Sequence, residues 1–166
     1  MNLNWKTFLL QQNVLSDDQR NVTAIDESAI AGKTIYALDC FAIIVVSGKD
    51  AATLLQGQIT CNVNDISEEK SCLAAICNPK GRVIATFLLA KNANDFLLIL
   101  PTDLVETVKM RLQMYVLRSQ VQLVDASDDF CLLGLCEPGQ PHAGFHTKIS
   151  DVSVEIDFPG VCKRSL

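Results

Sequence analysis

The sequence predicts an α+β protein in which one or more antiparallel sheets pack against helices. Two apolar runs joined by a turn predict a β-hairpin, a third strand follows directly, and a long amphipathic helix comes next. Strands and helices do not alternate regularly, which disfavours a parallel sheet built from β-α-β units. The 166 residues are 49% hydrophobic and 20% charged, so we expect one domain with a substantial core.

The first third of the chain is expected to hold a helix followed by two strands. Apolar residues at helical spacing predict a short amphipathic helix over residues 5–12, and the polar stretch 16–21 then predicts a loop. β-Branched and aromatic residues concentrate in two further runs, which predicts strands over 33–39 and 41–47.

A short helix is expected directly after these strands. Asp50 stands where an N-cap residue would, the apolar pattern covers residues 51–56, and Gly57 is typical of a helix end. The helix should therefore lead into a polar turn.

The middle of the chain predicts three consecutive antiparallel strands. The apolar runs 71–77 and 82–90 are joined by Asn-Pro-Lys-Gly at 78–81, an order that a type I turn favours. The polar residues 91–95 predict a second turn into a strand over 96–100. We expect the three strands to form a meander.

A long helix and several short strands follow the meander. The helix is expected from Pro101 to about Leu117, because apolar residues recur on one face: Leu104, Val105, Val108, Leu112 and Tyr115. Strands are expected over 121–124 and 130–136, and a last one where apolar residues alternate at Val152, Val154 and Ile156.

The turn-rich stretch 137–141 divides the chain into two parts. We expect residues 1–136 to form the functional α+β region, and residues 137–166 to be an incomplete continuation of a longer architecture.

Charge and cysteine content narrow the class of protein. The net charge of −5 disfavours a protein that grips phosphate backbones through bulk electrostatics. The seven cysteines, an odd number, and a start without a secretory pattern favour a reduced, cytoplasmic setting. The longest apolar runs are far shorter than a membrane-spanning helix.

Metal sites and catalytic residues have little support in the sequence. Cys72 and Cys77 are five residues apart, as are Cys131 and Cys136, and such an odd separation points strand side chains to opposite faces. We therefore expect buried, inert thiols, with no metal site and no catalytic residue.

Two segments contain more hydrogen-bonding or charged side chains than a helix end and a hairpin turn require. The first, 54–63, places hydrogen-bonding side chains around a glycine where a helix ends, as in the wall of a polar cavity: Gln56, Gln58, Thr60 and Asn62. The second, 77–82, places Lys80 and Arg82 at a hairpin tip, where they can meet an anionic group. A capped helix and a well-made turn explain the same residues equally well.

Together these segments resemble a known family. The run Leu-Gln-Gly-Gln-Ile-Thr-Cys-Asn-Val at 55–63 is followed by Ala-Ala-Ile-Cys-Asn-Pro-Lys-Gly-Arg at 74–82 and then by a long helix. This combination is similar to the N-terminal region of the YgfZ family of folate-binding proteins, which is related to the T-protein (aminomethyltransferase) of the glycine cleavage system. The resemblance covers roughly residues 38–135.

The resemblance implies a tetrahydrofolate-binding protein that supports iron–sulfur cluster synthesis or repair, and through it the cluster enzymes that modify tRNA. It implies that Phe41 stacks on the folate. Because a pterin is flat with polar edges, Gln56, Gln58, Thr60 and Asn62 match the need for hydrogen-bonding groups, and Lys80 or Arg82 would meet the glutamate tail. The expected partners are the folate and iron–sulfur enzymes, without a membrane or direct nucleic-acid contact, and a homo-oligomer is left open.

Two departures from the relatives bear on activity. The T-protein carries a pair of aspartates where this chain has Ala85 and Thr86, so no carboxylate stands there to move a proton. The Lys-Gly-Cys hallmark of the YgfZ family does not occur in these 166 residues. We therefore expect folate binding without catalysis; the alternatives are an aminomethyltransferase-like one-carbon transferase and a non-functional truncated remnant.

Overall fold

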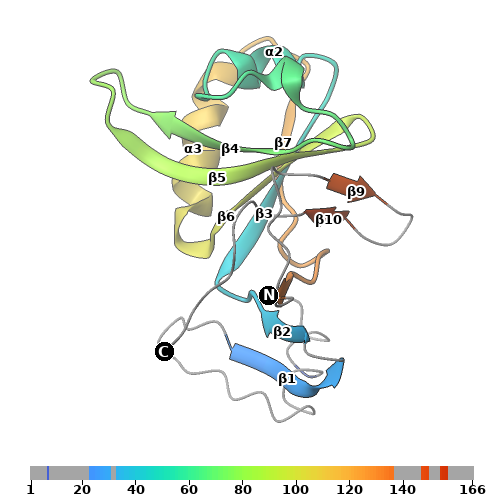
Figure 1. Ribbon diagram of the computed structural model, residues 1–166. Coiled ribbons are helices and arrows are strands. Elements are labelled where there is room, and N and C mark those ends of the chain that lie inside the picture. The colour runs from blue at the N-terminus through green and yellow to red at the C-terminus, as the bar shows by residue number, and fades with distance from the viewer. Residues whose placement is uncertain (1–6, 8–22, 31–32, 137–146, 150–153, 157–166) are drawn as a thin grey trace.

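The structure is a computed structural model that describes Thr7 and residues 23–30, 33–136, 147–149 and 154–156. Its largest element is a twisted five-stranded antiparallel sheet with the strand order β4-β5-β6-β3-β7 (Figure 1). The strands are β3 (Phe41–Ser47), β4 (Cys72–Cys77), β5 (Val83–Asn92), β6 (Asp95–Pro101) and β7 (Gln122–Asp125). The predicted α+β class is confirmed, and so is the meander, because β4, β5 and β6 are neighbours.

Two smaller sheets accompany the large one. The first has the order β1-β2-β8 and the second pairs β9 with β10. Their bounds are β1 (Thr23–Ile30), β2 (Lys33–Ala37), β8 (Leu133–Cys136), β9 (Thr147–Ile149) and β10 (Val154–Ile156). Neither β1 nor β9 was expected from the sequence; the apolar pattern of β1 is interrupted by Asp26 and Glu27.

Helices cover one face of the large sheet. Two α-helices contribute buried side chains to the main core: α2 (Ala51–Gln56) and α3 (Val105–Val116). The 3-10 helix η1 (Val63–Asp65) ends the polar turn after α2, and the 3-10 helix η2 (Thr102–Leu104) leads into α3. The inner face of α3 consists of Val105, Val108, Leu112 and Val116. Tyr115, which we expected on that face, is 37% exposed, since it lies one residue from the buried stripe.

The core has two parts because the strands alternate. In β3, Ala42, Ile44 and Val46 point into the main core with the helices, whereas Ile43 belongs to a smaller cluster on the opposite face with Ala90 and Leu97. Fully burying one such aliphatic side chain stabilises the fold by about 1.5–3 kcal/mol. Both faces of the sheet therefore contribute to stability, although only one is covered by helices.

The turn between β4 and β5 has the predicted geometry. The amide of Gly81 donates to the carbonyl of Asn78 at 2.9 Å, and the Asn78 side-chain oxygen accepts from the amides of Lys80 and Arg82. Gly81 has φ +75°, which L-residues adopt only with strain, so a glycine is favoured after the type I turn.

Asp50 precedes α2 as predicted but does not cap it. Its side chain makes no capping bond and instead accepts a hydrogen bond from the amide of Gln120 at 2.7 Å. A tertiary contact has therefore replaced the local one, and it joins the start of α2 to the segment before β7.

Some expectations fall outside the described residues. These are the helix over 5–12, of which only Thr7 is described, and most of the expected continuation over 137–166. Within that continuation, β10 confirms the last predicted strand at Val154 and Ile156. Among the helices that the structure describes, none has both the length and the hydrophobicity to cross a membrane.

Candidate functional site

Phe41 begins β3 on the sheet face that carries no helix. Its neighbour Ala42 points into the main core, so the Phe41 ring lies on the opposite face, and it is 38% exposed. An exposed aromatic ring at a strand start is a natural platform for stacking a flat heterocycle.

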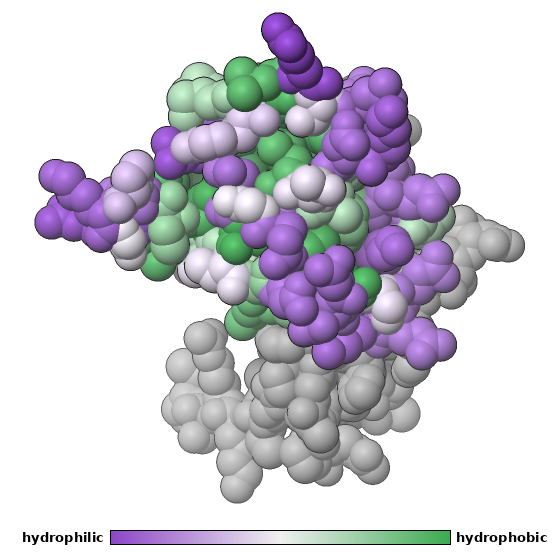
Figure 2. Space-filling view, turned by 90° about the horizontal axis from the view of Figure 1, so that it is seen from above, coloured by the Kyte–Doolittle hydropathy of each residue, from purple (hydrophilic) through white to green (hydrophobic). Residues whose placement is uncertain are grey.

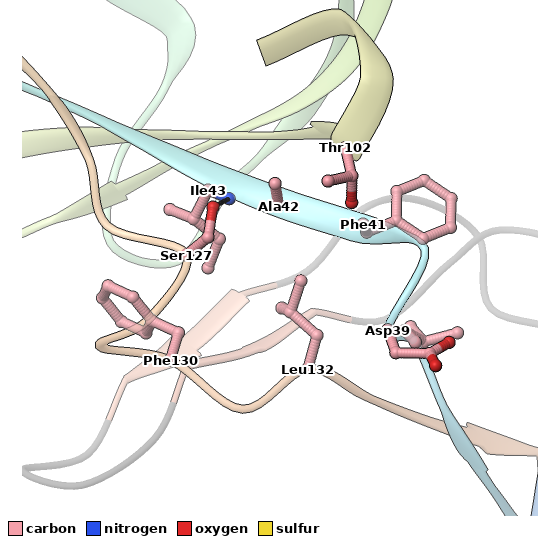
Figure 3. A pocket seen from close by; sticks show the side chains of 9 residues that line it. Asp39, Phe41, Ala42, Ile43, Thr102, Ser127, Phe130 and Leu132 are labelled. Carbon is pink, nitrogen blue, oxygen red and sulfur yellow. Dashed lines mark hydrogen bonds between the residues drawn. The ribbon is translucent and has the colours of Figure 1, made fainter. Parts of the chain in front are cut away.

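A small pocket lies beside this ring (Figure 3). Its volume is about 60 Å³, far below the roughly 300 Å³ at which ordinary small-molecule sites begin, so a pterin does not fit inside it. The pocket is lined by Leu38, Asp39, Phe41, Ala42, Ile43, Thr102, Ser127, Phe130 and Leu132.

Strand register defines a row of residues level with Phe41. Phe41 pairs with Pro101 of β6, and Leu88 pairs with Ile99, so the same register continued by two residues sets Thr86 of β5 opposite Pro101. Thr86 in turn pairs with Ala75 of β4. Two strand spacings, roughly 10 Å, therefore separate Phe41 from Thr86.

The row also shares one face of the sheet. Ala85 and Phe87 belong to the main core, as do Ala74 and Ile76, so Thr86 and Ala75 point to the same side as Phe41. We call Phe41, Thr86 and Ala75 the Phe41 surface. It offers an aromatic ring and an exposed hydroxyl at a separation that a bicyclic ring system can span.

The polar turn predicted as a cavity wall lies elsewhere. Thr60 bonds to the backbone of Ala75 in both directions, so it lies beyond β4 at roughly 19 Å, or four strand spacings, from Phe41. Gln58 lines a groove with residues of α2 and α3, on the helix-covered side. The structure therefore does not bring this turn to Phe41.

Three side chains of the turn are bonded to the turn's own backbone or that of β4. The oxygen of Gln56 accepts from the amide of Val63 at 2.7 Å, the hydroxyl of Thr60 accepts from the amide of Ala75 at 2.9 Å, and the oxygen of Asn62 accepts from the amide of Asn64 at 3.2 Å. These bonds satisfy amides at the start of η1 and the edge of β4. They show a structural role for Gln56, Thr60 and Asn62.

Lys80 and Arg82 lie at the exposed tip of the β4–β5 hairpin. Figure 1 shows this tip turned away from the start of β3 by the sheet twist, and in Figure 2 it is the hydrophilic projection at the left. The two cations are close to each other in the chain, but the structure does not set them against the Phe41 ring.

Of the residues that line the pocket, only Phe41 was predicted from the sequence as a site residue; the polar or aromatic ones that were not predicted are Asp39, Thr102, Ser127 and Phe130. Thr102 begins η2, while Ser127 and Phe130 follow β7; the Ser127 hydroxyl donates to the carboxylate of Asp125 and accepts from the amide of Ile43. In Figure 3 the Phe130 ring lies across the pocket from Phe41. Nothing in the local pattern singled out these residues, because their role depends on the fold bringing 127–132 beneath β3.

The cysteines differ from the expectation of buried thiols. Cys131 is exposed, and Cys40, Cys61, Cys72 and Cys77 are only partly buried. The thiols of Cys61 and Cys72 are hydrogen-bonded to each other; burial, with smaller contributions from Cys61, raises the pKa of Cys72 to about 12. Within the described ranges no three His, Cys, Asp or Glu side chains gather as metal ligands.

Fold and surface together define a class: an α+β domain whose large antiparallel sheet is covered by helices on one face and exposes an aromatic ring on the other. Residues 15–142 match the family described as the GCVT N-terminal domain, and the chain belongs to this family. The resemblance stated from the sequence is thereby confirmed.

Two known proteins show what the chain is similar to in sequence and in fold. It is 30% identical over 130 residues to the tRNA-modifying protein YgfZ of Enterobacter sp. (strain 638), a match of 78% of this chain and 37% of that protein. The crystal structure of glycine cleavage system aminomethyltransferase T from Bartonella henselae shares the fold, with a TM-score of 0.65 and 13% identity over 83% of this chain and 41% of that one. The chain thus spans about two fifths of the length of both relatives.

Proposed function

We propose that this chain is a folate-binding domain that holds tetrahydrofolate against the Phe41 surface. The observation that carries the proposal is the 38% exposure of the Phe41 ring on the sheet face without helices. Membership of the GCVT N-terminal domain family and the similarity to YgfZ support it. Stacking on the ring would shelter the flat pterin, and the hydroxyls of Thr86 and Thr102 would face its polar edges.

In this proposal the pterin lies on the outer side of the Phe41 ring. The pocket of about 60 Å³ on the other side is too small to admit it. Asp39 and Thr102 line that pocket, and Figure 3 shows their side chains beside the Phe41 ring.

The other predicted contacts enter the proposal in two roles. Lys80 and Arg82 would meet the glutamate tail, which extends away from the pterin. Gln56, Thr60 and Asn62 would shape the polar turn. The backbone amide of Gln58 donates to the carbonyl of Leu55, but its side-chain amide has no hydrogen bond to another described residue and would be the turn's candidate for ligand contact.

We propose further that folate binding serves iron–sulfur cluster synthesis or repair, and through it tRNA modification in the cytoplasm. The Enterobacter relative is a tRNA-modifying protein, which supports the second part. Iron–sulfur enzymes that act on tRNA would be the partners. Catalysis by this chain is not part of the proposal, because Ala85 is buried in the main core and the exposed neighbour is Thr86 rather than an acid.

Calorimetric titration of the 166-residue chain with tetrahydrofolate under reducing conditions tests the proposal. Binding is expected for the parent chain, and Phe41→Ala should weaken it about tenfold or more, because the stacked surface is lost. Met110→Ala is a control, since Met110 is 64% exposed and lies on α3, away from both Phe41 and the groove that Gln58 lines. Equal affinity for the parent chain and Phe41→Ala, or no binding by the parent, would reject the Phe41 surface as the site.

Two further variants test the contacts proposed away from Phe41. Gln58→Ala tests the contact of the polar turn with the ligand, and Lys80→Ala combined with Arg82→Ala tests the contact with the glutamate tail. Loss of the cations should weaken binding of a folate with several glutamates more than one with a single glutamate. If both variants bind every folate as the parent does, the tail and the turn take no part in recognition.

A further inference from the structure

Cys61 and Cys72 stand at the two ends of one closed loop. Cys61 lies in the polar turn after α2, and Cys72 is the first residue of β4. The ten residues between them contain η1 and a tight turn, in which the amides of Ser67 and Lys70 donate to each other's carbonyls at 3.0 and 3.2 Å. We call the segment 61–72 the cysteine loop.

Backbone pairing holds the base of the cysteine loop. The amide of Thr60 donates to the carbonyl of Ala75 at 2.9 Å, and the amide of Ala75 donates to the hydroxyl of Thr60, also at 2.9 Å. Thr60 directly precedes Cys61, and Ala75 lies three residues after Cys72. These two bonds therefore keep the entry and the exit of the loop side by side.

The two thiols meet against the main core. Both side chains pack on this core, both are only partly buried, and the two thiols are hydrogen-bonded to each other. A disulfide requires its two cysteines to be close neighbours in space, because the bond between the sulfurs is only about 2 Å long. The cysteine loop therefore already brings together the two sulfurs that such a bond would join.

We propose that Cys61 and Cys72 are a redox-active pair, which a low-molecular-weight disulfide such as oxidised glutathione converts to a disulfide that closes the cysteine loop. In a reducing compartment the pair remains as two thiols, and oxidation of the glutathione pool closes it. This inference is independent of folate binding, because it uses no residue of the Phe41 surface.

The exchange proceeds in two steps. The Cys61 thiolate attacks one sulfur of oxidised glutathione, breaks its S–S bond and releases one glutathione thiolate, which takes up a proton. Cys72 then loses its proton to solvent, and its sulfur attacks the Cys61 sulfur and releases the second glutathione. Two protein thiols are thereby oxidised by two electrons, and one oxidised glutathione is reduced to two thiols.

The surroundings of Cys72 set the order of these steps. Burial raises the pKa of Cys72 to about 12, which disfavours its thiolate as the first nucleophile, so the first attack belongs to Cys61. The Lys70 ammonium favours the Cys72 thiolate and thereby assists the second step. Cys72 is thus the resolving member of the pair.

Peptide mapping of the folded 166-residue chain tests the pairing. The chain is incubated with excess oxidised glutathione at about pH 8, free thiols are blocked with N-ethylmaleimide in denaturant, and trypsin is added without a reductant. Trypsin cuts after lysine, so the expected disulfide joins the peptides 50–70 and 71–80. Fragmentation in the mass spectrometer should assign the bond to Cys72 rather than to Cys77.

Two single variants and a matched control assign the two roles. Cys61→Ser and Cys72→Ser should each lose the bond. In Cys72→Ser a mixed disulfide with glutathione should remain on Cys61, because the resolving thiol is missing. Cys77→Ser removes another partly buried cysteine of β4 and should form the bond to the same extent as the parent.

The same reaction in urea shows whether the fold selects the pair. The unfolded chain should distribute its disulfides over several cysteine pairs, and the fraction that joins Cys61 to Cys72 should fall about fivefold or more. Oxidation should raise the Tm of the folded chain by about 5–10 °C, because the crosslink restricts the unfolded chain. Cys72→Ser should show no such rise.

Three results would overturn the inference. The first is a folded chain in which oxidised glutathione forms no bond between Cys61 and Cys72, and the second is a bond that is equally frequent in the folded and the urea-unfolded chain. The third is a bond that leaves Tm unchanged or lowers it, since the native loop would then have to distort to form it. A bond that is selective for the folded chain, lost with either cysteine and kept in Cys77→Ser supports the inference.

Discussion

The thiol of Cys72 differs from an ordinary cysteine in its ionisation. Burial is the main cause that raises its pKa from 9.0 to about 12, and the neighbouring Cys61 thiol adds to the effect. The folded state therefore favours the neutral thiol of Cys72. The stabilisation that this neutral thiol contributes is present in full below pH 9 and is lost as the pH rises towards 12. Since the thiolate is the reactive form, Cys72 should be a poor nucleophile at pH 9.

Alkylation measures this difference directly. With iodoacetamide at pH 9, Cys72 should react at least about tenfold more slowly than the exposed Cys131, with sites assigned by fragmentation mass spectrometry. The same residue in urea-unfolded protein is the internal reference and should react quickly. Equal rates for the two cysteines in the folded chain would show that burial does not protect Cys72.

Thr60 shows why single site residues were harder to predict than the elements that carry them. Its hydroxyl looks like a ligand group in the sequence, but in the structure it accepts the amide of Ala75 at the edge of β4. Polar residues in turns often bond to nearby backbone, and a sequence does not show whether that bond or a ligand uses the oxygen. Phe41 was proposed as a ligand contact through the family resemblance, and that role stays a prediction. Phe130 lines the pocket only through a contact between segments far apart in the chain.

The junction between β3 and α2 depends on one glycine. Gly48 has φ +110°, and a Cβ atom there would lie 2.1 Å from the backbone oxygen of Gln120. The segment at Gln120 is held in place by Asp50, whose carboxylate accepts its amide. The backbone therefore has little freedom to move away from an added methyl group.

Gly48→Ala should lower the free energy of unfolding by more than about 3 kcal/mol, from strain and overpacking together. Gly81→Ala is the matched comparison, because Gly81 also has positive φ but has nothing within 4 Å of the added Cβ. It should cost only about 1–2 kcal/mol from backbone strain. Urea unfolding of both variants measures the two values, and a Gly48→Ala variant no less stable than Gly81→Ala would contradict this account of the junction.

At the scale of the whole molecule, the meander within the large sheet was predictable, and the pairing of the remaining strands of that sheet was not. The β4–β5–β6 meander rests on local turn chemistry and apolar runs, which a sequence displays directly. The pairing of β3 with both β6 and β7 joins residues about 50 to 80 positions apart, and no local pattern encodes it. The Phe41 surface depends on that pairing, since it sets Phe41 level with Thr86.

The two sides of the large sheet should unfold together, because each strand contributes to both. In β6, Leu98 is fully buried in the main core and the adjacent Leu97 is buried in the smaller cluster on the opposite face. Leu98→Ala and Leu97→Ala should each cost about 2–5 kcal/mol, and the cost of Leu97→Ala should lie nearer the lower limit because fewer side chains surround it. Thermal unfolding followed by far-ultraviolet and near-ultraviolet circular dichroism should give one coincident transition for the parent and for both variants. A second transition in Leu97→Ala alone would mean that the smaller cluster unfolds separately from the main core. The sheet face that carries Phe41 would then be an independent unfolding unit.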